Sequence, residues 1–585
     1  MLESRGRRAS SLLAGIALLA CGAMSACGGG PQSARSSAPA RTSAPAASTG
    51  SPKPAVDVAK IVAGMSTEEK VGQLFVTRVI GTKAGAGTAE AIRKYHLGGV
   101  IYFPENLKSP AQIADLSNGL QDAARGSGGK VPLLIATDQE GGLVARLDGI
   151  ITDFPGNMPL GATRSTKDAR DAARVTATEL RALGLNFDYA PDSDVNINPA
   201  NPVIGIRSFG ADPGLVSRLA GAAIDGYQKS GVAASAKHFP GHGDTDVDSH
   251  TGLPVITHSK KEWERVDAPP FRAAIRHHVD VIMTAHVVMP KLDPSRTPAT
   301  LSKKILTGLL RDELHYDGVV TTDGLEMAGV REKYGDAQVA IRAIKAGADQ
   351  LLLPPNLSTQ YNAVLGAVKK GEISKKRLNE AVTRIVKLKA SRGLFTAAPA
   401  SAKKAASKVR TSANQAVARR VADHSVTLVK KSGSVPLHGS VFVTGVTTDA
   451  LAGGLRDHGV KNVTASATGT SPSASAISAA ASRAKAADAA VVTTDGARIS
   501  TAQRNLVAAI RRTGRPVAVV AVGTPYDISA MPDVPTYIAT YSREAASLRA
   551  AAKILTGDLL PTGKLPVSIP KQGGGTLYKI GHGLS

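Results

Sequence analysis

Residues 318–323 read Gly-Val-Val-Thr-Thr-Asp, a short apolar run that ends in a carboxylate. Similar apolar runs recur along the chain, separated by longer stretches of helical composition, at 72–76, 98–103, 132–136, 186–190, 232–236, 281–285 and 350–353. Short strands that alternate with helices are typical of β/α units and of a parallel sheet. Eight such runs within residues 56–395 predict an α/β fold, a (β/α)8 TIM-type barrel, rather than a doubly wound open sheet.

A second α/β unit follows the predicted barrel. Residues 396–410 are rich in Ala, Ser and Lys, and we interpret them as a linker. Further apolar runs predict the strands of a C-terminal domain over residues 411–585; they lie at 440–443, 489–492, 516–520 and 536–539. This domain contains no Gly-x-Gly-x-x-Gly motif, so the sequence offers no support for a dinucleotide site.

The composition is that of a globular protein with an excess of positive charge. Among 585 residues, 43% are apolar and 20% are charged, and 71 Lys and Arg against 47 Asp and Glu give a formal net charge of +24. A basic balance favours contact with polyanions, and an anionic cell wall is the expected neighbour. A single Trp and 4% aromatic residues argue against a stacking groove for polysaccharides or single-stranded nucleic acid, so no nucleic-acid partner is expected.

The chain has two cysteines, Cys21 and Cys27, and both lie near the N-terminus. This placement excludes a disulfide framework, a cysteine zinc site and a cysteine nucleophile in the rest of the chain. Residues 24–27 read Met-Ser-Ala-Cys and resemble a bacterial lipobox, in which the cysteine is lipidated and becomes the first residue of the mature protein. Cys27 is therefore the predicted lipidation site. Acylation at Cys21 is one alternative, and a plain secretory signal is another.

The residues on either side of this cysteine also indicate export. A positive region at residues 5–8 precedes an apolar stretch that is shorter than the roughly 20 residues of a membrane-spanning helix. Residues 1–26 are predicted to be a lipoprotein signal peptide, and residues 27–55, rich in Ser, Ala, Pro and Thr, a flexible tether. We expect a protein that is exported and lipid-anchored to the outer face of the cell membrane, with no other contact with the membrane.

The densest polar segment, residues 237–250, follows the predicted fifth strand and reads Lys-His-Phe-Pro-Gly-His-Gly-Asp-Thr-Asp-Val-Asp-Ser-His. Asp248 and His250 are close enough in sequence to form a hydrogen-bonded pair, in which the carboxylate stabilises the protonated imidazole. Glycosidic cleavage needs such a proton donor for the leaving oxygen. A solvated polar loop is one alternative. A calcium loop that starts at Asp244 is another, but it lacks the Gly and the bidentate Glu of such loops, so no metal is predicted.

Asp323 is the second candidate for chemistry, because it ends the apolar run quoted above. A carboxylate at the carboxyl end of a barrel strand lies on the face that carries active sites, where it can act as the nucleophile of a retaining glycosidase. An aspartate at a strand end can instead cap the next helix. Residues 491–496 repeat the sequence of residues 319–324, Val-Val-Thr-Thr-Asp-Gly, which makes Asp495 a competitor. We favour Asp323 because it belongs to the predicted barrel.

Other polar residues near strand ends suit a sugar pocket. Asp138 follows the third strand with Arg146 in the same short segment, and Arg207 lies in a loop after the fourth strand. A buried carboxylate can accept hydrogen bonds from two sugar hydroxyls, and an arginine can donate to a sugar oxygen or an acetamide. Either arginine could equally form a structural salt bridge. Asp194 and His286 are expected to be structural.

These motifs resemble those of glycoside hydrolase family 3, and within it the bacterial β-N-acetylglucosaminidases (β-hexosaminidases). The resemblance rests on four stretches of the predicted barrel, which are residues 138–142, 201–210, 237–250 and 322–327. The third of them is long and specific to that branch. Residues 555–568 resemble part of the family's C-terminal α/β sandwich domain. Leu143, after the Gly-Gly pair, and Gly324, after Asp323, depart from the residues that are common in the family.

The resemblance implies a retaining, two-step hydrolysis that needs no cofactor. Asp323 would be the nucleophile that forms a glycosyl-enzyme, and His250 would act first as acid and then as base, tuned by Asp248. The residues implied to bind the N-acetylglucosamine ring are Asp138, Arg146, Arg207, Lys237 and His238.

The function predicted on this basis is that of an exo-acting β-N-acetylglucosaminidase for cell-wall muropeptides or chitin oligosaccharides. A histidine acid/base carries no negative charge and would not repel phosphate, so a phosphorylase is an alternative. A β-glucosidase of the same fold is another, although its acid/base is usually a carboxylate from the second domain. A sugar-binding lipoprotein without turnover is the third, and it would have no need of Asp323, Asp248 and His250. The sequence predicts neither the oligomeric state nor the natural aglycone.

Overall fold

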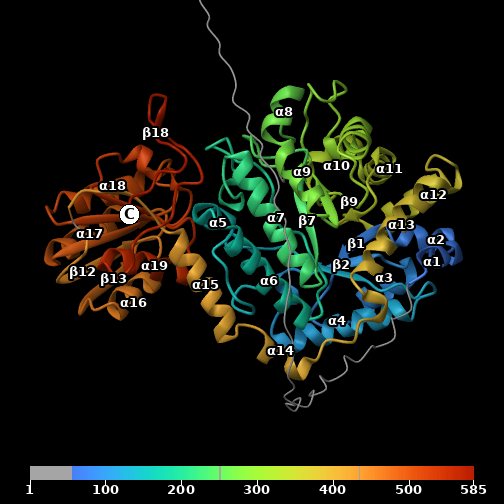
Figure 1. Ribbon diagram of the computed structural model, residues 1–585, viewed down its shortest axis with the longest axis horizontal. Helices are drawn as coiled ribbons and strands as arrows, with labels where there is room; N and C mark the ends of the chain where they lie inside the picture. The colour runs from blue at the N-terminus through green and yellow to red at the C-terminus, as the bar shows by residue number, and fades with distance from the viewer. Residues whose placement is uncertain (1–55, 250–251, 434) are drawn as a thin grey trace, which may run out of the picture. The chain divides into compact units, whose positions relative to one another are not determined.

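The computed structural model describes residues 56–585 except 250, 251 and 434 (Figure 1). The predicted signal peptide, the tether and the lipidation site Cys27 lie outside the described residues, and so does the predicted acid/base His250. Within the described part of the chain, no helix combines the length and the apolar character needed to cross a membrane.

A parallel sheet of eight strands forms the first domain, and its strands coincide with the eight predicted apolar runs. In spatial order they are β10 (Leu351–Leu352), β1 (Phe75–Arg78), β2 (Gly99–Ile101), β3 (Leu134–Thr137), β6 (Phe187–Asp188), β7 (Ala233–Phe239), β8 (Val281–Thr284) and β9 (Val319–Thr321). A parallel bridge between Thr321 and Gln350 joins the two edges, so the sheet is nearly closed into a barrel. The predicted barrel fold is therefore confirmed.

Helices alternate with the strands and surround the barrel (Figure 1). They are α1 (Val58–Gly64), α2 (Thr67–Gly72), α3 (Ala86–Tyr95), α4 (Pro110–Arg125), α5 (Asn157–Thr163), α6 (Thr166–Ala182), α7 (Pro213–Lys229), α8 (Lys260–Val266), α9 (Ala268–Arg276), the π-helix η4 (Lys304–Glu313), α10 (Ala328–Tyr334), α11 (Asp336–Ala346), α12 (Leu357–Lys369) and α13 (Lys375–Ser391). Several begin at polar caps: Ser66 and Glu69 form a reciprocal capping box at α2. Asp212 accepts from the Leu215 N–H at the start of α7.

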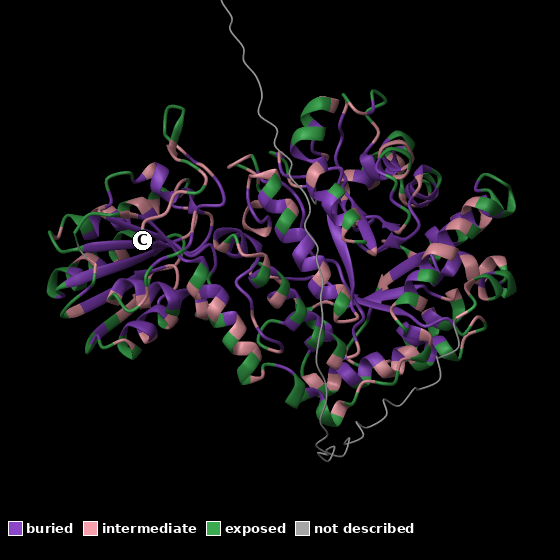
Figure 2. Cartoon of the chain, in the orientation of Figure 1, coloured by how far each residue is buried: buried purple, intermediate pink, exposed green. Residues whose placement is uncertain are grey.

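Apolar side chains of the strands fill the barrel and the layer between strands and helices. In Figure 2 the strands of the barrel are coloured as buried. Phe75, Val100 and Ile135, on three adjacent strands, are fully buried. Parallel strands that are covered on both sides are buried along their length, which is why they read as continuous apolar runs in the sequence. The polar residues that follow these runs leave the core at the carboxyl ends of the strands.

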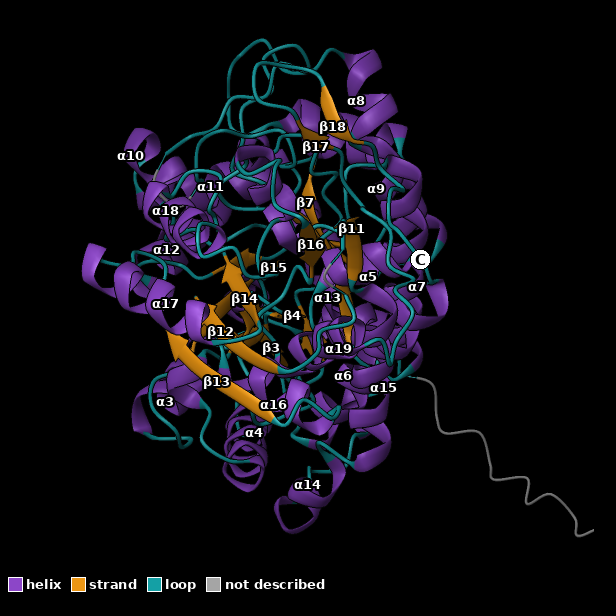
Figure 3. Ribbon diagram, turned by 90° about the vertical axis from the view of Figure 1, so that its left-hand side faces the viewer, coloured by secondary structure: helices purple, strands orange, loops and turns teal. Residues whose placement is uncertain are grey.

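The C-terminal domain is built on a second, mixed sheet (Figure 3). Its strands, in spatial order, are β11 (Thr427–Lys431), β16 (Thr536–Ala539), β15 (Val517–Ala521), β14 (Ala489–Thr494), β12 (Ser440–Gly445) and β13 (Asn462–Ala467), and only β11 runs antiparallel to its neighbour among the described strands of this sheet. Its helices are α15 (Ser412–Ser425), α16 (Asp449–Asp457), α17 (Ala474–Ala486), α18 (Thr501–Arg511) and α19 (Ala545–Thr556), and β17 (Ile569–Pro570) pairs with β18 (Thr576–Tyr578). The sequence pattern does not reveal β11 and β13, because these two edge strands carry few apolar residues.

The segment 396–410, predicted as a linker, contains the helix α14 (Ala402–Lys408), which packs against α4 of the barrel. A second contact joins the two domains at α5. Met158 and Ala162 of this barrel helix lie in the apolar core of the C-terminal domain, and the Lys564 N–H donates to the Ala162 carbonyl at 3.0 Å. The domains are therefore packed together as well as connected by the chain.

Candidate active site

The carboxyl ends of the barrel strands surround a cavity of about 180 Å³. The predicted nucleophile and all of the predicted substrate-binding residues line it: Asp323, Asp138, Arg146, Arg207, Lys237 and His238. Asp248 is not one of the residues that line it, although Ser249 is. The cavity is smaller than the roughly 300–1,000 Å³ of pockets for drug-sized ligands, a size that suits one sugar ring.

Asp323 follows β9 and faces the cavity. Burial opposes ionisation of its carboxyl group, but nearby positive charges, chiefly that of His238, lower the pKa of Asp323 to about 2. An ionised carboxylate is the form that can attack an electrophilic carbon. His286, which we expected to be structural, is buried, and its Nε2 lies 3.0 Å from the carbonyl oxygen of Gly324. This contact supports the residue next to the predicted nucleophile.

Lys237 lies near the carboxyl end of β7 and is almost fully buried. Its Nζ is 3.0 Å from Asp138 Oδ1 and 2.7 Å from Glu140 Oε1. Burial favours the neutral amine, but the charges of Glu140 and Asp138 raise the pKa of Lys237, so the lysine stays charged. The cavity thus presents a fixed cationic donor beside a carboxylate that can accept.

Glu140 is a site residue that we did not predict. It lies on the short strand β4 (Gln139–Gly141), which pairs with β5 (Val144–Ala145), and it accepts from Arg207 through both oxygens, at 3.0 Å from Nε and 2.9 Å from Nη2. Burial opposes ionisation, but the charges of Arg207 and Lys237 hold the pKa of Glu140 well below its usual range. Its position within the 138–142 motif is the sequence signal that could have identified it as a site residue. Its partner Arg207 is 67 residues away in the sequence.

His238 is oriented by Asp194. Its Nδ1 lies 2.7 Å from Asp194 Oδ2, and its Nε2 lies 3.4 Å from Arg207 Nη2. Because an ionised carboxylate can only accept, Nδ1 carries the proton that is donated to Asp194. Burial opposes ionisation of Asp194, but His238 lowers the pKa of Asp194, so the carboxylate remains charged. Asp194, expected to be structural, thus fixes the ring of a residue that lines the cavity.

His242 also lines the cavity, and the sequence assigned it no role. Its Nε2 is 2.9 Å from Ser249 Oγ, and its Nδ1 is 3.0 Å from Thr245 Oγ1. Burial, followed by the neighbouring His238, lowers the pKa of His242 to about 4, so this imidazole is neutral near pH 7. It therefore links the start and the end of the segment 242–249 next to the cavity.

Asp248 lies on the same segment, and its carbonyl accepts from the Gly252 N–H at 2.9 Å. His250 lies outside the described residues. The pairing of Asp248 with His250 therefore stays a prediction.

Phe103 forms an aromatic wall of the cavity that the sequence did not reveal. The guanidinium carbons of Arg78 and Arg146 lie 5.2 Å and 5.6 Å from the centre of its ring. Arg78 also donates to Glu326, another lining residue, at 2.8 Å. Arg146 Nη2 is 3.8 Å from Asp138 Oδ2. One wall of the cavity is therefore apolar, and the side chains around that wall are charged. This combination suits a ligand with both C–H and O–H groups.

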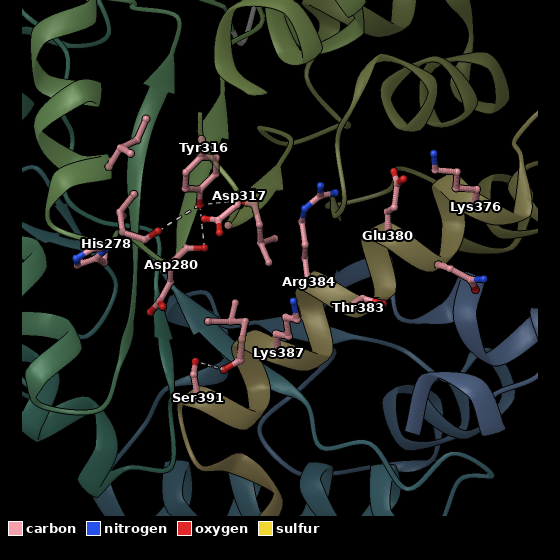
Figure 4. A pocket seen from close by; sticks show the side chains of 16 residues that line it. His278, Asp280, Tyr316, Asp317, Lys376, Glu380, Thr383, Arg384, Lys387 and Ser391 are labelled. Carbon is pink, nitrogen blue, oxygen red and sulfur yellow. Dashed lines mark hydrogen bonds between the residues drawn. The ribbon is translucent and has the colours of Figure 1, made fainter. Parts of the chain in front are cut away.

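A larger cavity, of about 1,070 Å³, lies at the opposite end of the barrel. Figure 4 shows the side chains that line it. It is bordered by residues that precede β8 and β9 and by α13, among them Asp280, Tyr316 and Arg384. Tyr316 Oη lies 2.9 Å from the carbonyl oxygen of Asp280, inside the fold. Active sites of (β/α)8 barrels lie at the carboxyl ends of the strands, so position rather than volume identifies the smaller cavity as the candidate active site.

Two sequence profiles of one family match the chain. The Glycosyl hydrolase family 3 N terminal domain matches residues 66–388, and the Glycosyl hydrolase family 3 C-terminal domain matches residues 389–585. The chain is also 38% identical over 379 residues to beta-hexosaminidase A of Pseudoalteromonas piscicida. That match covers 61% of this chain and 63% of the relative, so the chain spans less than two thirds of the relative's length.

Solved structures show the same architecture. A glycoside hydrolase family 3 beta-N-acetylglucosaminidase from Paenibacillus sp. is similar with a TM-score of 0.82 and 37% identity, over 86% of this chain and 99% of that one. The beta-glucoside phosphorylase BglX is similar with a TM-score of 0.74 and 26% identity, over 87% of this chain and 95% of that one. The matched profiles together cover both domains of the structure, and the chain belongs to glycoside hydrolase family 3.

Proposed function

We propose that this protein is a retaining exo-β-N-acetylglucosaminidase that removes terminal β-linked N-acetylglucosamine from cell-wall muropeptides or chitin oligosaccharides. The observation that carries the proposal is the small cavity in which the ionised Asp323 faces the cationic Lys237 and Arg207. The relatives named beta-hexosaminidase A and beta-N-acetylglucosaminidase support the choice of sugar.

In the first step the Asp323 carboxylate attacks the anomeric carbon, and the bond between that carbon and the leaving oxygen breaks. His250, protonated beside Asp248, gives its proton to the leaving oxygen. The result is a glycosyl ester on Asp323 and a free aglycone. The pKa of Asp323, about 2, supports this role because the nucleophile is then ionised at neutral pH.

In the second step water attacks the anomeric carbon of the ester, and neutral His250 takes a proton from that water. The ester bond breaks, Asp323 leaves as a carboxylate, and His250 returns to its protonated form. Two displacements at one carbon restore the original configuration, so the released sugar keeps its β-anomeric form.

The sugar ring would be held by groups whose positions are fixed before it arrives. Lys237 and Arg207 can donate to hydroxyl or acetamide oxygens, and Asp138 can accept from hydroxyls. Glu140 holds both cations through contacts of 2.7 to 3.0 Å. Donors that are already oriented need no reorganisation when charge develops at the anomeric carbon.

A phosphorylase is the second candidate, in which phosphate rather than water attacks the glycosyl-enzyme and sugar 1-phosphate is released. An imidazole acid/base does not repel an anion, and the similarity to the beta-glucoside phosphorylase BglX favours testing it. Turnover of an aryl β-N-acetylglucosaminide should be compared with and without phosphate. Free sugar at a rate independent of phosphate supports the hydrolase, whereas sugar 1-phosphate and strong phosphate dependence support the phosphorylase.

Two variants test the catalytic assignment. Asp323→Asn removes the proposed nucleophile and should lower kcat on an aryl β-N-acetylglucosaminide by several powers of ten. Asp495→Asn is a matched control, because Asp495 is the fifth residue of the same hexapeptide in the C-terminal domain and pairs there with Arg543. It should keep activity near the wild-type value. Unchanged turnover in Asp323→Asn would refute the proposal. If the wild type turned over an aryl β-glucoside faster than the aryl β-N-acetylglucosaminide, a β-glucosidase would be favoured. If the wild type bound the sugar without turnover, a sugar-binding protein would be favoured.

We also propose that the protein is exported and anchored to the outer face of the cell membrane through a lipid on Cys27. The support is the lipobox-like sequence at residues 24–27 and the composition of residues 27–55. Metabolic labelling with a fatty acid tests it in cells that produce the full chain. Cys27→Ser should abolish incorporation and Cys21→Ser should not; the reverse pattern would move the site to Cys21, and label in neither wild type nor variants would refute the anchor.

A further inference from the structure

Asp244 and His258 close the base of the long loop that follows β7. Asp244 Oδ2 lies 3.1 Å from His258 Nε2, although the two residues are 14 positions apart. Asp248, Ser249 and the proposed acid/base lie between them in the sequence. The pair therefore joins the two ends of the segment that would supply the proton donor.

His258 is also held on its other side. Its Nδ1 lies 2.7 Å from Oδ2 of Asp267, a buried residue between α8 and α9. Hydrogen bonds to Asp244 and then to Asp267 raise the pKa of His258 to about 10, so the imidazolium donates one N–H to each carboxylate. Charged hydrogen bonds of this kind are stronger than neutral ones. The reaction steps given above make no use of His258.

The start of the loop, at Pro240 and Gly241, packs directly against Asp267 and Trp263. Gly241 has a φ of +137°, and a Cβ atom at this position would come within 2.6 Å of Asp267 Oδ1. The Trp263 Nε1–H donates to the carbonyl of Pro240 at 2.9 Å. The backbone at 240–241 therefore packs against α8 and the start of α9, with no room for a side chain at Gly241.

The other side of the loop is held by the segment that follows β6. Asn201 Nδ2 donates to the carbonyl of His242 at 2.9 Å, and Asn198 Nδ2 donates to the carbonyl of Thr245 at 3.2 Å. These bonds fix the start of the loop. The bridge from Asp244 to His258 connects that fixed start to the end of the loop, just before α8.

We propose that His258 is a positioning residue for the reaction: by bridging Asp244 and Asp267 it fixes the base of the loop 244–258 and holds the segment 245–249, whose Ser249 lines the cavity, in place. The catalytic consequence rests on the proposed function. A closed base removes conformations that an open loop would sample. His258 is not one of the residues that line the cavity, so it acts through the loop and not on the substrate.

Asp244→Ala is the sharpest variant, because it breaks the bridge while the buried pair of His258 and Asp267 stays intact. A catalytic group displaced by about 1 Å can lose about 100-fold in rate, so kcat should fall by about 10- to 100-fold. KM and the dissociation constant for N-acetylglucosamine should stay near the wild-type values, because the lining residues are untouched. His258→Ala should behave alike, and imidazole in solution should restore part of its kcat. Asp246→Ala, an exposed aspartate of the same loop, is the control and should resemble the wild type.

Hydrogen exchange of the amides at 241–249 gives a readout that does not depend on turnover. Exchange should be faster in Asp244→Ala and His258→Ala than in the wild type, and unchanged in Asp246→Ala. The inference would be overturned if both bridge variants kept the wild-type kcat and the wild-type exchange rates. It would also be overturned if the variants had a lower thermal stability while kcat per folded enzyme stayed unchanged. A wild type that turned over no aryl β-glycoside would refute the proposed function, and exchange would still decide whether the bridge holds the loop.

Discussion

Lys237 and Glu140 form an ion pair of 2.7 Å in which the lysine side chain is 2% exposed and the glutamate side chain 1% exposed. Arg207 shares the same carboxylate at 2.9 Å. Two cations that line the cavity therefore share the carboxylate of Glu140. Removing one partner of a buried pair leaves an uncompensated charge, which is more costly than losing an exposed contact.

Glu140→Ala should therefore destabilise the fold strongly. We expect the free energy of unfolding to fall by about 3–5 kcal/mol, visible as a lower Tm, together with weaker binding of N-acetylglucosamine. Glu68→Gln is the control, because Glu68 and Lys369 form a pair of 2.8 Å whose side chains are 44% and 60% exposed. Its effect should stay within about 1 kcal/mol. Equal Tm changes in the two variants would contradict the role given to Glu140.

The low pKa of Asp323 predicts the acid side of the pH profile. With an aryl substrate whose leaving group needs no protonation, kcat/KM reports the nucleophile without the proton donor. Because the pKa of Asp323 is about 2, its carboxylate is already ionised at higher pH, and kcat/KM should be flat from about pH 4 upward. An acid limb with an apparent pKa near 5 that persists in His250→Ala would contradict this assignment.

The His258 bridge predicts a pH-dependent contribution to stability. Its hydrogen bonds raise the pKa of His258 to about 10, above the ordinary histidine value of about 6.5. The contribution is therefore complete below about pH 6.5 and is lost as the pH rises through about 10. Asp244, Asp267 and Glu262 are the carboxylates that act on this imidazole. The Tm difference between wild type and His258→Ala should shrink between pH 7 and 10, and a difference that grows over this range would argue against the charged bridge.

The C-terminal domain is predicted to fix the segment that carries Arg207. Gly210 has a φ of +149°, and a Cβ atom there would come within 2.4 Å of the Pro566 carbonyl oxygen, so Gly210→Ala must shift this backbone. We expect a higher KM for the aryl substrate and a lower Tm. Gly574→Ala is the control, because Gly574 has a φ of +110° and open space around it. Equal KM changes in the two variants would show that backbone strain, and not the contact with Pro566, is responsible.

The barrel could be predicted from the sequence because its strands are covered on both sides and read as continuous apolar runs. Once these runs are located, the residues that follow them, such as Asp138 and Asp323, are assigned to the carboxyl face of the barrel. Local sequence alone does not separate Asp323 from Asp495, since both are the fifth residue of the same hexapeptide. Membership of the barrel made that distinction.

The remaining site residues could not be predicted, because their roles depend on partners far away in the sequence. Glu140 meets Arg207 across 67 positions, and Asp194 meets His238 across 44. Phe103 looks like an ordinary apolar residue at the end of a strand until Arg78 and Arg146 are seen beside its ring. Such contacts are properties of the folded barrel and leave no local pattern in the chain.

The identity of the nucleophile can be measured directly by trapping the enzyme with a fluorinated N-acetylglucosamine analogue that slows the second step, followed by peptide mapping. We predict one equivalent of label on the peptide that contains Asp323 and none on the peptide that contains Asp495. Label on Asp495, or on any carboxylate that does not line the cavity, would contradict the active site described above.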